Sequence, residues 1–136
     1  MAGKLTIYTE NKLLDHLLSG PDFVRPATLH FVAFSVPPDE TGGGTELSGN
    51  GYTRKAVTAN TTNLPAAANS VKANGVAIEW AAFTGGPQTV VAVGAMDAPV
   101  AGNLLFYDVV STPKTYTTGD IMRIEVNGLT VSFVEV

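Results

Sequence analysis

The sequence has 136 residues and a formal net charge of -4, with 12 acidic residues against 8 lysines and arginines. The 45% apolar and 15% charged composition is that of a folded chain, and the length is typical of one domain. The acidic balance argues against a DNA or RNA partner, and the lack of cysteine excludes disulfides and thiolate metal sites. We therefore expect a single domain over residues 1–136.

The first twenty residues, 1–20, are expected to form an N-terminal arm and a short amphipathic helix. Thr9 can cap the first turn and Gly20-Pro21 can end the helix, which predicts a helix from roughly Glu10 to Ser19. Polar residues interrupt the apolar ones too early for a secretion signal, and the apolar stretches are too short for a membrane helix. We therefore expect a protein made in a cytoplasm, with no membrane partner. Four leucines repeat at helical spacing: Leu13, Leu14, Leu17 and Leu18.

After Pro26 the pattern changes from helical to extended. The stretch ATLHFVAFSV, residues 27–36, is rich in β-branched and aromatic residues and has apolar residues at both parities. This pattern is typical of a strand covered on both faces. Further strands are expected at residues 52–59, 89–95 and 104–110.

Two Asn-Gly pairs predict hairpins. Asn127-Gly128 is the preferred two-residue turn, and it would pair Ile124 with Val131 across the hairpin. A second hairpin is expected around Asn74-Gly75. In its second strand Val76, Ile78 and Trp80 would share one face, which favours a core position for Trp80.

Seven or eight short strands after one helix predict an all-β fold. We expect a mainly antiparallel β-sandwich, with a jelly-roll arrangement or a closed barrel as alternatives. No internal repeat of solenoid or propeller type is present.

The stretch PPDETGGGTELSGNGYTR, from Pro37 to Arg54, looks most like a binding loop. A phosphate loop would need a helix after it, and this stretch leads into a predicted strand. A calcium loop would need alternating oxygen ligands, which are missing. We interpret residues 37–51 as an exposed connection that is free to contact a partner, and we expect no cofactor.

Other candidate chemistry is weak. His16 and His30 have no partner at zinc-ligand spacing, and no nucleophile elbow is present, so we expect neither a metal site nor an enzyme. Trp80 could alternatively stack on a sugar. Tyr52, Tyr107 and Tyr116 are candidates for an interface.

Four segments carry a resemblance to a known family. They are ENKLLDHLLSG, PATLHFVAFSV, PPDETGGGTELSGNGYTRKAVT and GNLLFYDVVSTPKTYTTGDIMRIEVNGLTVSF. In this order they resemble small virion proteins of tailed bacteriophages that are usually labelled tail fibre proteins. The chain has none of the repeats or heptads that build a long fibre, so the resemblance implies a compact virion module.

The resemblance implies a non-catalytic structural protein in the phage particle. Two placements stay open: a tail-attached accessory protein, and a decoration or cement protein on the capsid. Either one predicts other virion proteins as partners, such as major capsid or tail proteins, and a homo-oligomer or a lattice-bound protein. The alternative is a carbohydrate-binding module that recognises host surface glycans. The expected contact residues are Leu5, Ile7 and Tyr8 in the arm, with Tyr52 and Arg54 after the glycine-rich stretch.

Overall fold

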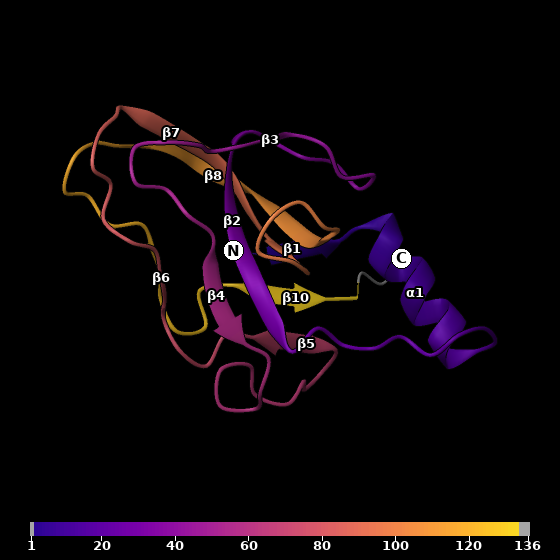
Figure 1. The fold of residues 1–136 in the computed structure, drawn as a ribbon. Helices are drawn as coiled ribbons and strands as arrows, with labels where there is room; N and C mark the ends of the chain where they lie inside the picture. Colours follow the sequence, from indigo (N-terminus) through magenta and orange to yellow (C-terminus); the bar gives the residue numbers. More distant parts are fainter. Residues whose placement is uncertain (1, 134–136) are drawn as a thin grey trace.

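The structure is a computed structural model that describes residues 2–133 (Figure 1). Over these residues a short strand and a helix are followed by nine further strands. In chain order the elements are β1 (Ala2–Leu5), α1 (Ile7–Leu17), β2 (Thr28–Val36), β3 (Thr45–Glu46), β4 (Lys55–Thr58), β5 (Val71–Ala73), β6 (Ile78–Glu79), β7 (Gln88–Met96), β8 (Leu104–Tyr116), β9 (Arg123–Ile124) and β10 (Thr130–Ser132).

Three long strands, β2, β7 and β8, form the centre of the fold and pair antiparallel. Phe31 of β2 lies opposite Ala95 of β7. Phe31, Val32 and Ala33 have no exposed surface, so β2 is covered on both faces, as its apolar residues at both parities predict. The strands expected at residues 27–36, 89–95 and 104–110 are confirmed, and the last of them continues to Tyr116.

One eight-stranded sheet runs in the order β3-β2-β7-β8-β1-β10-β5, and β4 also pairs with β2. β6 and β9 form a separate two-stranded sheet. The pairs are antiparallel except for β1 and β10, which run parallel. The all-β fold with one short helix is therefore confirmed.

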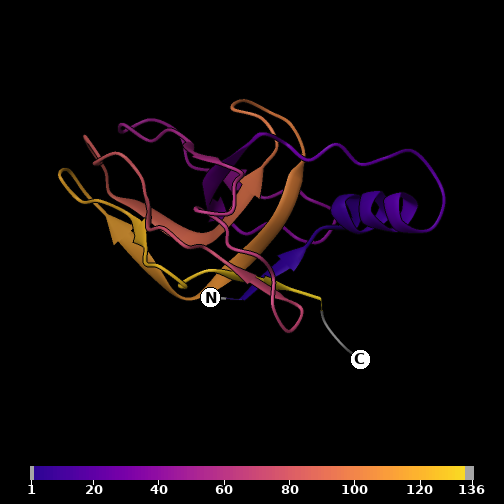
Figure 2. The same cartoon turned by 90° about the horizontal axis from the view of Figure 1, so that it is seen from below.

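The main core lies between two layers of strands. Phe31 of β2 and Val93 of β7 pack in one cluster with Ile78 of β6 and Ile124 of β9, so the small sheet covers the inner face of the large one. Phe34 belongs to a smaller cluster on the other face of β2. Figure 2 shows the strands curving around this core, with α1 at one end of the molecule.

The helix begins earlier than predicted, at Ile7 instead of Glu10. Its N-cap is Thr6 and not Thr9. Thr6 Oγ1 accepts a hydrogen bond from the Thr9 N–H (3.4 Å) and donates one to the carbonyl oxygen of Leu104 in β8 (2.6 Å). Thr9 lies inside the helix and donates to the carbonyl oxygen of Leu105 (2.7 Å). Contacts with β8 therefore decide where the helix begins, and the leucine spacing could not show this.

The predicted C-terminal hairpin is wrong, although its turn forms. The Gly128 N–H donates to the carbonyl oxygen of Glu125 (2.8 Å), which closes the turn. The strands on either side, β9 and β10, then separate. Ile124 lies opposite Ile78 of β6, whereas β10 runs between β1 and β5, so Ile124 does not pair with Val131.

The side chain of Asn74 lies between the two arms of this turn and explains the separation. Its Nδ2 donates to the carbonyl oxygens of Glu125 and Val76 (both 2.8 Å), and its Oδ1 accepts from the Leu129 N–H (3.0 Å). These bonds occupy backbone groups that a hairpin ladder would use. The predicted hairpin at Asn74-Gly75 is wrong for the same reason, because β5 pairs with β10 and β6 pairs with β9.

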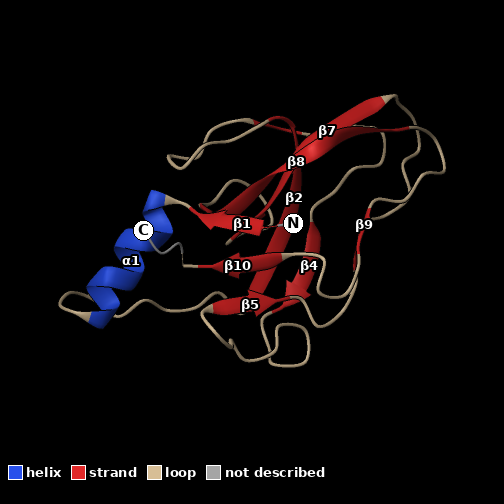
Figure 3. Cartoon of the chain, turned by 180° about the vertical axis from the view of Figure 1, so that it is seen from behind, coloured by secondary structure: helices blue, strands red, loops and turns tan. Residues whose placement is uncertain are grey.

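Seen from behind, α1 lies beside the ends of β1 and β10 and does not cover the sheet (Figure 3). Over residues 2–133 no helix is both long and apolar enough to cross a membrane. The helix therefore leaves part of its own surface, and part of the neighbouring strands, open to solvent.

Candidate functional site

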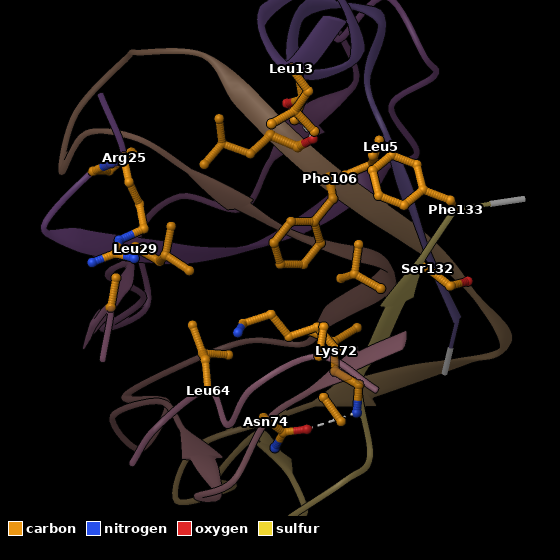
Figure 4. Close-up of a pocket in the computed structure, with 18 of the residues that line it drawn as sticks. Leu5, Leu13, Arg25, Leu29, Leu64, Lys72, Asn74, Phe106, Ser132 and Phe133 are labelled. Atoms are coloured by element: carbon orange, nitrogen blue, oxygen red, sulfur yellow. Dashed lines mark hydrogen bonds between the residues drawn. The ribbon is translucent and has the colours of Figure 1, made fainter. Parts of the chain in front are cut away.

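An apolar hollow of about 350 Å³ opens beside α1 (Figure 4). Leu13 points into it from the helix, Leu29 comes from the start of β2, and Phe106 of β8 lies in its middle. Leu64 and Phe133 line two of its other sides. The hollow is thus bounded by segments that are far apart in the sequence.

The shape of the hollow follows from large residues at its base and small ones at its wall. The Phe106 ring packs edge-on against Phe31, with ring centroids 6.1 Å apart and an interplanar angle of 71°. On the wall that precedes and includes β5, the side chains are short: Ala59, Ala67 and Ala73. Alanine side chains do not reach the opposite wall, so the space between stays unfilled.

The charged residues that line the hollow are both cations, Arg25 and Lys72. Lys72 Nζ donates to the carbonyl oxygen of Pro65 (3.0 Å), and Arg25 is exposed. Among the described residues that line the hollow there is no aspartate or glutamate, although acidic residues outnumber basic ones in the chain. The hollow is therefore complementary to an apolar group that carries a carboxylate.

The side of α1 that faces away from the body is also apolar. Leu14, Leu17 and Leu18 have 55%, 76% and 75% of their surface exposed, and we call these three residues the leucine stripe. Thr9 and Leu13 face the body instead. Large exposed apolar surface on a folded protein is typical of an interaction site.

The three arm residues expected to make contacts lie in different surroundings. Leu5 lines the hollow. Ile7 is 38% exposed and lies on the side of the helix that carries Leu14, seven residues later. Tyr8 is half-buried against the main core, with Lys12 Nζ 5.7 Å from its ring centroid. Their role in contacts stays a prediction.

Tyr52 and Arg54 are brought together by Glu46. Tyr52 Oη donates to Glu46 Oε2 (2.8 Å) and accepts from the Ala33 N–H (3.0 Å). Arg54 Nη2 donates to Glu46 Oε1 (2.8 Å) and Arg54 Nε to Glu46 Oε2 (3.0 Å). Burial is the main cause that raises the pKa of Tyr52 above its ordinary value. The network joins β3 and the start of β4 to the central strand β2.

Arg54 also ties down the loop between β7 and β8. Its Nη1 donates to the carbonyl oxygens of Ala98 (2.7 Å) and Ala101 (2.8 Å), and its side chain is only 10% exposed. The hydrogen bonds with Glu46 raise the pKa of Arg54. Both predicted contact residues, Tyr52 and Arg54, thus have polar partners within the chain, and their role in an interface stays a prediction.

The glycine-rich segment is an exposed connection, as predicted, and it also contacts the helix. Asp39 Oδ1 accepts from the Thr41 N–H (2.8 Å) and Oγ1 (2.6 Å), and these bonds lower the pKa of Asp39. The carbonyl oxygen of Glu40 accepts from the Ile7 N–H (2.8 Å) at the first residue of α1. The segment between β2 and β3 therefore helps to fix the position of the helix.

Trp80 is only 3% exposed and belongs to the main core, as its parity predicts. Stacking of a sugar on Trp80, which was the alternative, is therefore wrong. In the described part of the chain no three histidine, aspartate or glutamate residues are grouped to hold a metal ion.

Residues 4–132 match the family model described as Podophage GP4 fiber I protein gp80. The chain belongs to this family. No curated protein matches the chain. The matched range includes α1, the hollow-lining residues from Leu5 to Ser132, and the Tyr52–Glu46–Arg54 network. The match confirms the resemblance to phage tail fibre proteins, and the protein is a structural protein of the phage fibre type.

Sequence reasoning identified the leucines of this gp80 family member but missed most of the hollow. Phe23, Arg25 and Pro26 line it, and Val24 beside them is 84% exposed. The signal was present in the sequence FVRP, which places bulky apolar residues outside any predicted element. Such residues in a connection indicate either a docked loop or an exposed apolar surface.

Proposed function

We propose that this gp80 family member is a non-catalytic docking module of a podophage virion. It binds neighbouring virion subunits through the apolar hollow and the leucine stripe. The observation that carries the proposal is that these two apolar surfaces adjoin each other, with Leu13 in the hollow and Leu17 exposed beside it. A rigid β-sheet body holds both in place.

Burial of the exposed leucines supplies the driving force for docking. Removing apolar surface from water contributes roughly 25 cal/mol per Å². Docking costs translational and rotational freedom, so a single small patch binds weakly, whereas many copies on one particle bind with avidity. A small module with one apolar face suits repeated attachment to a larger assembly.

The family's description as a fibre protein favours attachment to the tail or its fibres over capsid decoration. To test this, purified protein is mixed separately with detached tails and with empty capsids from particles that lack it, and bound protein is measured after sedimentation. We expect binding to tails. Binding to capsids alone, together with a higher melting temperature of the shell, would instead support a cement role. Binding to neither would contradict the docking proposal.

The docking surface is tested with a charge placed in the leucine stripe. Leu17→Glu should reduce binding to the assembly, because a carboxylate would have to lose its water in an apolar contact. Val100→Glu is the matched control, since Val100 is 79% exposed and lies outside the hollow. Equal binding by both variants would show that the leucine stripe is not the docking surface.

A further inference from the structure

We propose that the partner on this surface is a second copy of the same chain. The leucine stripe of each copy covers the hollow of the other, so the contact is reciprocal. This inference rests on the docking role proposed above and names the partner of that same surface.

The first argument is that the helix cannot bury both of its apolar sides on one body. Leu13 faces the hollow of its own chain, while Leu17 and Leu18 beside it are about three-quarters exposed. The hollow in turn holds about 350 Å³ of space lined by leucine and phenylalanine side chains. Each chain therefore presents an uncovered apolar ridge and an uncovered apolar hollow.

The second argument is charge. The helix and the turn after it carry three exposed acidic residues, Glu10, Asp15 and Asp22, against one lysine, Lys12. The lining of the hollow carries the opposite charge, from Arg25 and Lys72, with no acidic residue among its described members. A helix from a second copy thus brings carboxylates to the cations of the hollow.

The turn that presents these charges is ordered by its own contacts. The Phe23 N–H donates to His16 Nδ1 (3.1 Å), and Asp22 Oδ1 lies 3.7 Å from the same nitrogen. These contacts fold residues 16–23 back toward the body, where Phe23 and Arg25 line the hollow. Little further ordering of this turn is needed on association.

The position of the two surfaces favours a reciprocal pair. A two-fold contact uses the same patch on both subunits, so ridge and hollow must adjoin each other on one face. They do, since Leu13 on the helix lines the hollow and Leu17 follows it by one turn. A two-fold axis near Leu17 would place each ridge over the other hollow.

A small amphiphile with a carboxylate is the other ligand that an apolar hollow with cations could bind. It would fill the hollow and leave the leucine stripe uncovered. A second copy covers both surfaces in one contact, so the observations favour the second copy.

The test is the mass of the full chain in solution, measured by analytical ultracentrifugation over a range of concentrations. We expect self-association that Leu17→Glu abolishes and that Arg25→Glu weakens at least tenfold, with Arg25→Lys close to the parent. Added salt should also weaken it, because part of the attraction is between charges. Val100→Glu should associate as the parent does.

Cross-linking then locates the contact, because the chain has no cysteine of its own. Leu17→Cys and Ala67→Cys variants are mixed and treated with a short bismaleimide; Ala67 is exposed and lines the hollow. We expect mixed dimers with this pair and none when Val100→Cys replaces Leu17→Cys. A chain that stays monomeric, binds a fluorescent fatty acid instead, or cross-links equally in the control pair would overturn the inference.

These results are separable from the docking test. Self-association lost in Leu17→Glu, with tail binding retained, leaves the second-copy contact standing and removes the heterologous docking role. A monomer that binds tails through the leucine stripe does the reverse.

Discussion

Asn74 and Leu129, which are 55 residues apart, exchange two hydrogen bonds. The Leu129 N–H donates to Asn74 Oδ1 (3.0 Å), and the Asn74 N–H donates to the carbonyl oxygen of Leu129 (3.3 Å). The Asn74 side chain also bonds Glu125 and Val76 and is almost fully buried. One buried amide thus holds the turn before β10 against the strand that follows β5.

Asn74→Ala is expected to lower the free energy of unfolding by about 2–4 kcal/mol, because it leaves buried backbone groups without partners. The measurement is urea unfolding followed by circular dichroism. Asn11→Ala is the matched control, because Asn11 is exposed on α1, and its effect should stay within about 0.5 kcal/mol. Equal losses in both variants would mean that the Asn74 hydrogen bonds add nothing to stability.

Thr6→Ala is expected to cost about 1–2 kcal/mol, since the helix loses its N-cap and Leu104 loses a hydrogen-bond donor. Thr6→Ser keeps the hydroxyl and should cost clearly less. Hydrogen exchange gives the position of the effect, with faster exchange expected at the amides of the first turn of α1. Unchanged exchange there in Thr6→Ala would contradict the capping role.

The raised pKa of Tyr52 predicts a loss of stability at high pH. Its ordinary value is 10.0, and burial is the largest cause of the increase. The folded state holds this proton more tightly than the unfolded state, so the contribution is present below pH 10.0 and is lost as the pH rises toward the folded pKa.

Unfolding free energies measured on either side of pH 10.0 check this expectation. Tyr52→Phe should show a shallower decline with pH than the parent. Some decline should remain, because burial also raises the pKa of Tyr107 and Tyr116. Identical declines in parent and variant would show that Tyr52 titrates alike in the folded and unfolded states.

Trp80→Ala is expected to destabilise the fold by about 3–5 kcal/mol, because it leaves a cavity in the main core. Trp80→Phe should cost clearly less, since it fills most of that space and removes a buried indole N–H that has no hydrogen-bond partner in the described structure. Thermal melts of both variants check the order. Two stable variants would place Trp80 outside the core.

The strands and the helix were predictable because their signals are local. The apolar residues on both parities of residues 27–36 gave the most buried strand, and the four leucines of residues 13–18 gave the helix. The first residue of the helix was not predictable, because Thr6 caps it through contacts with β8. Likewise, Leu5 was expected to make contacts, but its place in an apolar hollow depends on strands far along the chain.

The sequence by itself determined that this protein is an all-β body with one amphipathic helix and a fibre-type family relationship, since periodicity, turn residues and matched segments are properties of neighbouring residues. Only the tertiary structure decided how the strands pair and where the apolar hollow opens. The turn at Asn127-Gly128 suits a hairpin, yet the buried amide of Asn74 bonds its two arms and directs them to different strands. Local preference amounts to a few tenths of a kcal/mol up to about one per residue, and several buried hydrogen bonds outweigh it.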